Sequence, residues 1–126
     1  SFTIVASDVS LTNTTNIQIA ALTIVKAITG SDLEIQADIN FASTDNVVGT
    51  FAFYTVVSGS PTTLLGSVDL FVRGNGATRL MQTLRRVNTT LSAGTHTIGV
   101  YFTATAGNGT QQAKADSVLS VREIKR

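Results

Sequence analysis

The most constraining feature of this sequence is a strict alternation of residue types between two turn signals near its C-terminus. The turn signals are Ser92–Gly94 and Gly107–Gly109, because Gly and Asn accept the positive φ that tight reversals need. A period of two places alternate residues on opposite faces of a β-strand. We therefore predict a central strand within Leu91–Gly109, with the other strands beside and opposite it. The two predicted faces are His96, Ile98, Val100, Phe102 and Ala104 against Thr95, Thr97, Gly99, Tyr101 and Thr103.

Similar alternation recurs along the rest of the chain. Asp32–Phe41 is the clearest case, because apolar residues occupy every odd position and polar residues every even one, which predicts one buried face. Val47–Val57 is apolar on both faces, which predicts a central strand or a strand whose outer face meets a partner. Within Ser1–Leu11 the apolar phase changes at Ser7 and Asp8, which predicts a bulge or a kinked edge strand.

One segment, Ala77–Leu91, permits two interpretations. Its many Thr residues and the neighbouring hairpin signals favour a strand. Four of its apolar residues have helical spacing instead: Leu80, Leu84, Val87 and Leu91. We predict a strand here, with a short helical turn near Met81–Arg85.

Together these segments give about eight strands separated by turns at short intervals, the pattern of an all-β sandwich. With 126 residues, of which 43% are hydrophobic, the chain is expected to form a single domain over residues 1–126. The inward-facing positions predict a core that includes Phe41, Phe53, Leu70, Leu84, Val100, Phe102 and Leu119.

Charge is sparse and unevenly spread. Charged residues make up 13% of the chain, about half the fraction typical of globular domains. Residues 1–70 hold one basic and six acidic side chains, whereas residues 71–126 hold eight basic and two acidic ones. Two interpretations are open: strands of the two halves alternate in space and cancel, or the asymmetry steers one copy of the chain onto another.

The sequence offers little for catalysis. It contains no Cys and one His, His96, which shares a predicted strand face with apolar residues and is expected near a sheet end or an interface. None of the common nucleophile, zinc-binding or phosphate-binding motifs occurs. We therefore predict that the chain is not an enzyme and that it uses no cofactor and no metal.

The acidic stripe formed by Asp32, Glu34 and Asp38 is the one set of carboxylates that could carry chemistry. Neighbours two apart on a strand face lie about 6.6 Å apart, from the ~3.3 Å rise per residue, and this overlaps the spacing of glycosidase carboxylates. Such sites need a pKa raised by burial, whereas this face is polar. The stripe is therefore predicted to be a solvated or interface face, and a ligand-binding or Ca²⁺-binding face is the alternative.

A basic cluster in the second half consists of Arg73, Arg79, Arg85 and Arg86. The sequence pI of about 8.1 and the aromatic content of 6% are lower than nucleic-acid binders usually show. We predict ion pairs or a solvated face here, and no nucleic-acid binding.

No apolar run reaches the length of about 18 residues that a membrane span needs, and the first residues do not read as a signal peptide. We therefore expect neither a membrane-spanning segment nor a signal peptide.

The last third of the chain resembles a known family. Leu91–Ile98 reads Leu-Ser-Ala-Gly-Thr-His-Thr-Ile and continues with Val100 and Phe102, and a terminal strand follows over Ser117–Ile124. This stretch resembles jelly-roll domains of bacteriophage structural proteins, such as fibre knobs, head fibres and capsid decoration proteins. It is also similar to the trimeric jelly rolls of the tumour-necrosis-factor and C1q type.

The resemblance implies both a fold and a role. The fold is an eight-stranded antiparallel β-sandwich of jelly-roll type, and an immunoglobulin-like sandwich is the alternative, because strand count alone does not fix topology. The role is that of a non-enzymatic, surface-exposed virion component, a capsid decoration, head-fibre or tail-fibre part. Such a component contacts other virion proteins and is assembled in the host cytoplasm.

Self-association as a homotrimer is also predicted. The apolar strand Val47–Val57, the low charge and the opposite charges of the two halves favour contact between copies. Threefold symmetry is implied by the resemblance alone, and a dimer fits the residues equally well. We expect Tyr54 or Val56 at the contact, with Arg85 or Arg86 reaching an acidic neighbour.

The alternative function is that of a carbohydrate-binding module or a lectin-like receptor-binding domain, with a host-surface glycan as its ligand. β-Sandwiches host many such sites, so the fold does not exclude one. Lectin sites usually offer an aromatic stacking platform, and this chain has no Trp and only two Tyr residues, Tyr54 and Tyr101.

Overall fold

The structure is a computed structural model that describes residues 1–11, 16–44, 47–72, 78–107 and 110–124. Within these ranges the chain forms ten β-strands and no helix, so no described helix is long and apolar enough to cross a membrane. Arg73 and residues 108–109 of the second turn signal lie outside the described residues. The strands are β1 (Phe2–Ile4), β2 (Val9–Ser10), β3 (Ile17–Lys26), β4 (Asp32–Ser43), β5 (Val47–Val57), β6 (Ser60–Val72), β7 (Thr78–Asn88), β8 (Gly94–Gly107), β9 (Gln111–Ala113) and β10 (Val118–Ile124).

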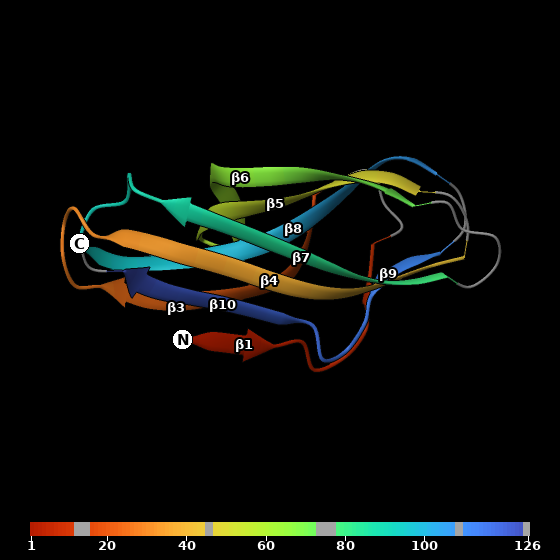
Figure 1. Ribbon diagram of the computed structural model, residues 1–126, viewed down its shortest axis with the longest axis horizontal. Coiled ribbons are helices and arrows are strands. Elements are labelled where there is room, and N and C mark those ends of the chain that lie inside the picture. The colour runs from red at the N-terminus through yellow and green to blue at the C-terminus, as the bar shows by residue number, and fades with distance from the viewer. Residues whose placement is uncertain (12–15, 45–46, 73–77, 108–109, 125–126) are drawn as a thin grey trace.

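The strands form two antiparallel sheets that pack face to face (Figure 1). In the six-stranded sheet β4 has β7 along one side and both β10 and β9 along the other, and β1 and β2 extend the sheet beyond β10 and β9. The four-stranded sheet has the order β3-β8-β5-β6. The predicted central strand is confirmed, because β8 lies inside its sheet between β3 and β5.

β1 and β2 are two parts of one interrupted strand, as are β9 and β10. Val5, which follows β1, bonds to the turn that precedes β10. Its N–H donates to the Ser117 carbonyl at 2.8 Å, and its carbonyl accepts from the Asp116 N–H at 2.9 Å. Ser7 and Asp8 lie in this break. The kinked edge strand predicted from the change of phase is therefore confirmed.

When each interrupted strand is counted once, eight strands pair in a nested order. The first pairs with the last, the second with the seventh, the third with the sixth and the fourth with the fifth. This is a long antiparallel hairpin rolled into a sandwich, which is the jelly-roll arrangement. The predicted eight-stranded jelly-roll sandwich is confirmed. The first two strands share a sheet in an immunoglobulin sandwich but lie in different sheets here, so that alternative does not apply.

The core lies between the two sheets and follows from the alternation along the strands. Phe41 of β4 packs its ring against Phe51 and Phe102, with ring centroids 6.0 and 5.5 Å away. Such aromatic pairs contribute about 0.5–1.5 kcal/mol beyond the area that they bury. All seven predicted core residues are buried. The inward side chains of β4 are 0% exposed: Leu33, Ile35, Ala37, Ile39 and Phe41.

β7 is a strand over its whole length, so the helical turn predicted near Met81–Arg85 is wrong. Every residue of that segment is paired with a residue of β4. The helical spacing misleads because it groups residues of opposite faces: Leu84 is buried, whereas Val87 is exposed. Long-range pairing with the most regular strand of the chain overrides the local pattern.

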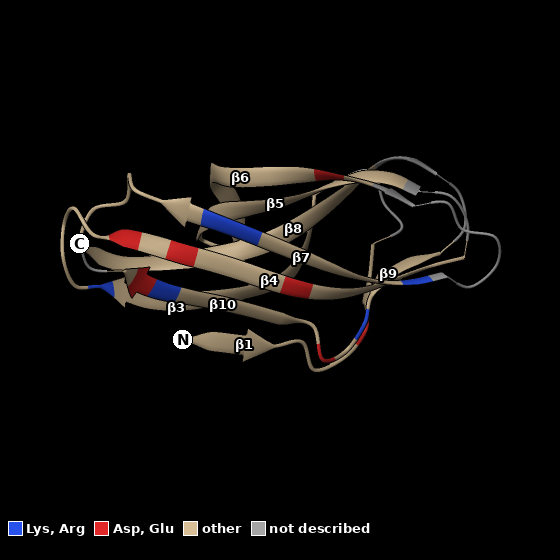
Figure 2. Ribbon diagram, in the orientation of Figure 1, with Lys and Arg blue, Asp and Glu red and all other residues tan. Residues whose placement is uncertain are grey.

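Charge is distributed very differently on the two sheets (Figure 2). In the six-stranded sheet the acidic strand β4 lies between β7 and β10, which carry arginines, so strands of the two halves alternate there and their charges cancel, as the first interpretation predicts. The charged residues of the four-stranded sheet are Lys26, which is buried, and Asp69. One sheet therefore presents neighbouring opposite charges, and the other is nearly free of charge.

Candidate interaction surfaces

Glu34 is the central residue of the acidic stripe, and two arginines bind its carboxylate. Arg122 lies opposite it on β10 and donates from Nε to Oε1 at 2.9 Å. Arg85 of β7 donates from Nη2 to Oε2 at 2.5 Å. These bonds, that of Arg122 above all, hold the pKa of Glu34 below its ordinary value. A general acid at neutral pH needs a raised pKa instead, so this carboxylate is arranged for ion pairing.

The other two members of the stripe also have partners. Asp38 accepts hydrogen bonds from Thr83 Oγ1 at 2.9 Å and from Gln36 Nε2 at 3.3 Å. Asp32 is buried at the start of β4 and interacts with a partner group as well. Within the described ranges, no group of three or more His, Asp or Glu residues is placed to hold a metal ion. A ligand-binding or cation-binding role for the stripe stays a prediction.

Tyr54 and Val56 lie on the outer face of the four-stranded sheet, beside Tyr101 of β8. The rings of Tyr54 and Tyr101 meet edge to face, with 5.5 Å between centroids and an angle of 87°. Tyr101 is only 2% exposed although it points away from the core, and its hydroxyl donates to Gln18 Oε1 at 2.8 Å. Burial raises the pKa of this hydroxyl. The centre of the face is therefore an ordered, uncharged aromatic cluster.

Gly99 makes room for this aromatic cluster. A Cβ at position 99 would lie 2.8 Å from the Tyr101 ring and 3.0 Å from Val56 Cγ2. Tyr54 and Val56 were predicted at an interface from the sequence, whereas Tyr101 and Gly99 were not. The signal that could have found them is the alternation in β8, which places Gly99 and Tyr101 on the same outward face.

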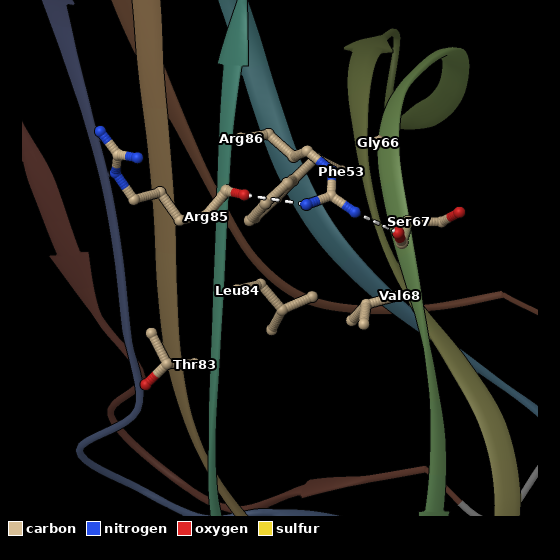
Figure 3. A pocket seen from close by; sticks show the side chains of 8 residues that line it. All are labelled: Phe53, Gly66, Ser67, Val68, Thr83, Leu84, Arg85 and Arg86. Atoms are coloured by element: carbon tan, nitrogen blue, oxygen red, sulfur yellow. Dashed lines mark hydrogen bonds between the residues drawn. The ribbon is translucent and has the colours of Figure 1, made fainter.

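Arg85 and Arg86 point in opposite directions from β7 (Figure 3). Arg85 reaches over the six-stranded sheet to Glu34, so the structure gives it an acidic neighbour within its own chain. Arg86 reaches towards β6, where Nη2 donates to the Ser67 carbonyl at 2.6 Å and the side chain covers Gly66. A cavity of about 70 Å³ lies between β6 and β7 at this point. It has room for a few water molecules.

The four residues predicted for a subunit contact therefore do not form one patch. Tyr54 and Val56 belong to the outer face of the four-stranded sheet, and Arg85 belongs to the opposite outer face of the sandwich. Arg86 lies at the side between β6 and β7. A contact that uses all four needs two copies that present different faces, and it stays a prediction.

A polar cluster at one end of the sandwich was not predicted from the sequence. Glu123 accepts hydrogen bonds from the backbone N–H groups of Ala27 and Ile28, both at 2.9 Å, and from the Ser31 hydroxyl. The Ser31 bond is the largest of the effects that lower the pKa of Glu123. Lys26 is 1% exposed, and its Nζ donates to the Ile28 carbonyl at 2.8 Å. These bonds fasten the loop between β3 and β4 to β10.

A second unpredicted cluster joins the break between β1 and β2 to the turn between β9 and β10. Lys114 Nζ donates to Asp8 Oδ2 at 2.5 Å, and the Ala115 N–H donates to Asp8 Oδ1 at 2.9 Å. The Lys114 bond is the main reason that the pKa of Asp8 is lowered. Both clusters join residues separated by 92 to 107 positions. No local pattern in the sequence signals such pairs.

His96 lies near the start of β8, at a sheet end as predicted. Its ring Nε2 donates to the Ser92 carbonyl at 2.9 Å. A catalytic base is instead oriented towards a nucleophile by a third group. This histidine fastens the turn that precedes its own strand.

Comparison with known proteins reveals a shared fold. No family model and no curated protein matches this sequence. A chain of the infectious bursal disease virus T13 viral particle is similar, with a TM-score of 0.62 and 13% identity over 98% of this chain and 30% of that chain. A chain of the VP2 subviral particle of the same virus is also similar, with a TM-score of 0.56 and 13% identity over 98% of this chain and 32% of that one.

A structure of the Gt strain of the virus agrees with these two. Its TM-score is 0.56 and its identity 16%, over 96% of this chain and 32% of that chain. At these identities, the similarity between this chain and the viral chains is a similarity of fold. This chain spans about a third of the length of the chains that it matches.

Proposed function

We propose that this chain is a non-enzymatic structural domain of a virion, which works through contacts with other proteins. The observation that carries the proposal is the match of nearly the whole chain to chains of a viral particle and of a subviral particle. The nested jelly-roll pairing supports it, because viral capsid domains are among the proteins built this way. The location that follows is the virion.

The surface chemistry agrees with a role in contacts. The arginines around Glu34 stabilise its ionised carboxylate, whereas a glycosidase keeps its general acid protonated, and Asp38 is held by neighbouring side chains. The opposite face offers an uncharged aromatic cluster with exposed apolar neighbours such as Leu64. Faces of this kind meet other protein surfaces.

The finer role is a surface-exposed component of a bacteriophage particle, a capsid decoration, head-fibre or tail-fibre part that assembles as a homotrimer in the host cytoplasm. The resemblance of Leu91–Ile98 and the strand after it supports this assignment. In that trimer the contact includes Tyr54 or Val56, because they lie on the uncharged face. The acidic stripe Asp32, Glu34 and Asp38 belongs to the opposite sheet, where Asp32 and Glu34 are buried, so a partner of the particle would meet the stripe at the half-exposed Asp38.

Co-expression tests the virion role. The chain is produced together with the proteins encoded beside its gene, and the lysate is separated on a density gradient. We expect the chain to migrate with assembled particles and to be labelled by antibody on their outer surface in electron micrographs. A chain that stays at the top of the gradient while particles form without it contradicts the proposal.

A lectin-like role is the second candidate, and one observation favours it. The half-exposed Tyr54 lies on an uncharged face that also carries hydroxyl groups. Among these are the side chains of Thr23 and Thr97, which bond to each other. A glycan array and calorimetry with host polysaccharide test this role. Binding that disappears in Tyr54→Ala, while the circular dichroism spectrum stays unchanged, makes the carbohydrate role the first.

A further inference from the structure

Each sheet of the sandwich ends in two edge strands, and proteins usually protect such edges with charges, prolines, bulges or short strands. β6 carries Pro61, its register against β5 shifts twice, and Arg86 binds its Ser67 carbonyl. β7 carries three arginines, and β1 is three residues long and ends at the break. In the described part of the chain, these three edges are therefore protected.

β3 is the fourth edge, and most of its length has no such protection. It is ten residues long, contains no proline, and pairs within the described residues on one side only, with β8. Its register shift lies between Gln18 and Ala20, so the ladder is regular from Ala20 onwards. Its one charged residue, Lys26, is buried at its end. A regular, uncharged edge of this kind is a template for another strand.

The side of the sandwich along β1 and β3 is also poor in charge (Figure 2). The first 25 residues contain a single charged side chain, Asp8, and Lys114 binds it. Phe2 of β1 and Val25 of β3 are 68% and 72% exposed. Exposed apolar side chains beside an unprotected edge are typical of a surface that meets another protein.

We propose that the β3 edge pairs with β3 of a second copy, in antiparallel register about a two-fold axis at Leu22. Ala21 of one copy then lies opposite Thr23 of the other, and Ala20 lies opposite Ile24. The buried Leu22 and Ile24 stay on the inner face in this register. Ala21 and Thr23 stay on the outer face, where they pair with Gly99 and Thr97 of their own β8. The two four-stranded sheets become one sheet of eight strands.

A second copy suits this edge for electrostatic and geometric reasons. No charged residue lies opposite another in the paired segment, and like charges in direct opposition are what destabilises such pairs. Two identical antiparallel edges satisfy each other's backbone groups about a two-fold axis, so one contact serves both copies. The net charge of +1 adds little repulsion between the copies.

This contact stands independently of the virion role. It uses an edge of the sheet, whereas the proposed trimer contact uses the outer face around Tyr54 and Val56. A cyclic trimer closes on itself, and a separate two-fold contact is what joins one closed ring to another. The β3 contact therefore supplies the second kind of contact that an extended assembly of trimers requires.

The test uses two double variants of the full chain that differ in one side chain. A21K/T23K places a lysine opposite a lysine at both symmetric positions, whereas A21K/T23E places a lysine opposite a glutamate. Sedimentation at micromolar concentration gives the mass of each. We expect A21K/T23K to have at most half the mass of A21K/T23E. The corresponding rise in the dissociation constant is about tenfold or more.

Controls separate this edge from the rest of the surface. Met81→Lys adds a charge at an exposed outer position of the six-stranded sheet, away from both β3 and the face around Tyr54, and should leave the mass unchanged. Circular dichroism verifies that each variant is folded. Among residues 20–24, the amides that point away from β8 should exchange more slowly as the wild-type concentration rises, and their exchange should stay constant in A21K/T23K.

Three results overturn the β3 contact: a wild-type chain that is monomeric throughout, equal masses for the two double variants, or halving of the mass by Met81→Lys. Slow exchange in a monomer also overturns it if it affects those amides of residues 20–24 that point away from β8, because another segment or protein then covers the edge. The density-gradient experiment tests the virion role alone, and sedimentation of the variants tests the β3 contact alone. Either proposal can therefore fail while the other holds.

Discussion

The two outer faces of the sandwich differ in how they carry charge. On the six-stranded sheet, Glu34 binds both Arg85 and Arg122, so the charges neutralise one another within one chain. On the four-stranded sheet, the one outward charge is Asp69, which accepts a hydrogen bond from Thr50 at 3.0 Å. Covering a charged face requires desolvation of every ion, whereas covering an uncharged face does not. The uncharged face is therefore the one suited to contact between copies.

A new charge at the centre of the uncharged face should have the largest effect. Val56→Glu buries a carboxylate without a partner if this face is the trimer contact, which costs about 3–5 kcal/mol of association free energy. We expect light scattering to show dissociation to monomers. The monomer should stay folded, because Val56 is half-exposed within one chain.

The matched control adds the same charge to the opposite face. Met81→Glu lies at an exposed position of the six-stranded sheet, the sheet that already carries charges, and should keep the assembly intact. Equal dissociation by Met81→Glu and Val56→Glu contradicts the contrast between the faces.

Gly99→Ala tests how closely the aromatic cluster is packed. The new Cβ would overlap the Tyr101 ring and crowd Val56, and overpacking of this kind costs about 1–3 kcal/mol of unfolding free energy. Urea denaturation measures the loss. In Gly66→Ala the new Cβ meets the flexible side chain of Arg86, which can move aside, so a smaller loss is expected. A larger loss in Gly66→Ala would show that the cluster on the uncharged face is loosely packed.

Tyr101→Phe removes one hydrogen bond from the same cluster. The hydroxyl donates to Gln18, and the loss of a hydrogen bond of this kind costs about 1 kcal/mol. The ring stays in place against Tyr54, so association of the chain should be unaffected. Urea denaturation measures the stability of this variant, and light scattering on the same sample measures its association. Dissociation of Tyr101→Phe would contradict the expectation that only stability changes.

Acid should destabilise the protein through the charged sheet, and this is the smallest of the four predicted effects. The arginines around Glu34 are exposed, so solvent screens their attraction to its carboxylate. Their hydrogen bonds hold the pKa of Glu34 below its ordinary value of 4.5. The stabilisation is therefore complete above the unfolded pKa and is lost as the pH falls through the lower folded pKa. The urea midpoint should decline only in acid, and Glu34→Gln should reduce that decline. A midpoint that drops at neutral pH contradicts this assignment.

The strands of this protein could be predicted from the sequence because the alternation of residues is a local property. The buried face of Asp32–Phe41, the break at Ser7 and Asp8 and the seven core residues all follow from a period of two. The helical turn near Met81–Arg85 was wrong for the same reason: a local spacing cannot report that every residue of that segment pairs with β4.

What the tertiary structure alone decided is which strand lies beside which, and with it the character of each outer face. Glu34 faces Arg122 from 88 positions away, and Tyr101 reaches Gln18 from 83 positions away. Alternation states that a side chain points outward, but the partner that it meets there depends on the nested pairing of the eight strands. The outward-facing Tyr101 is buried for this reason, because β5 and β3 bring covering side chains to both sides of β8.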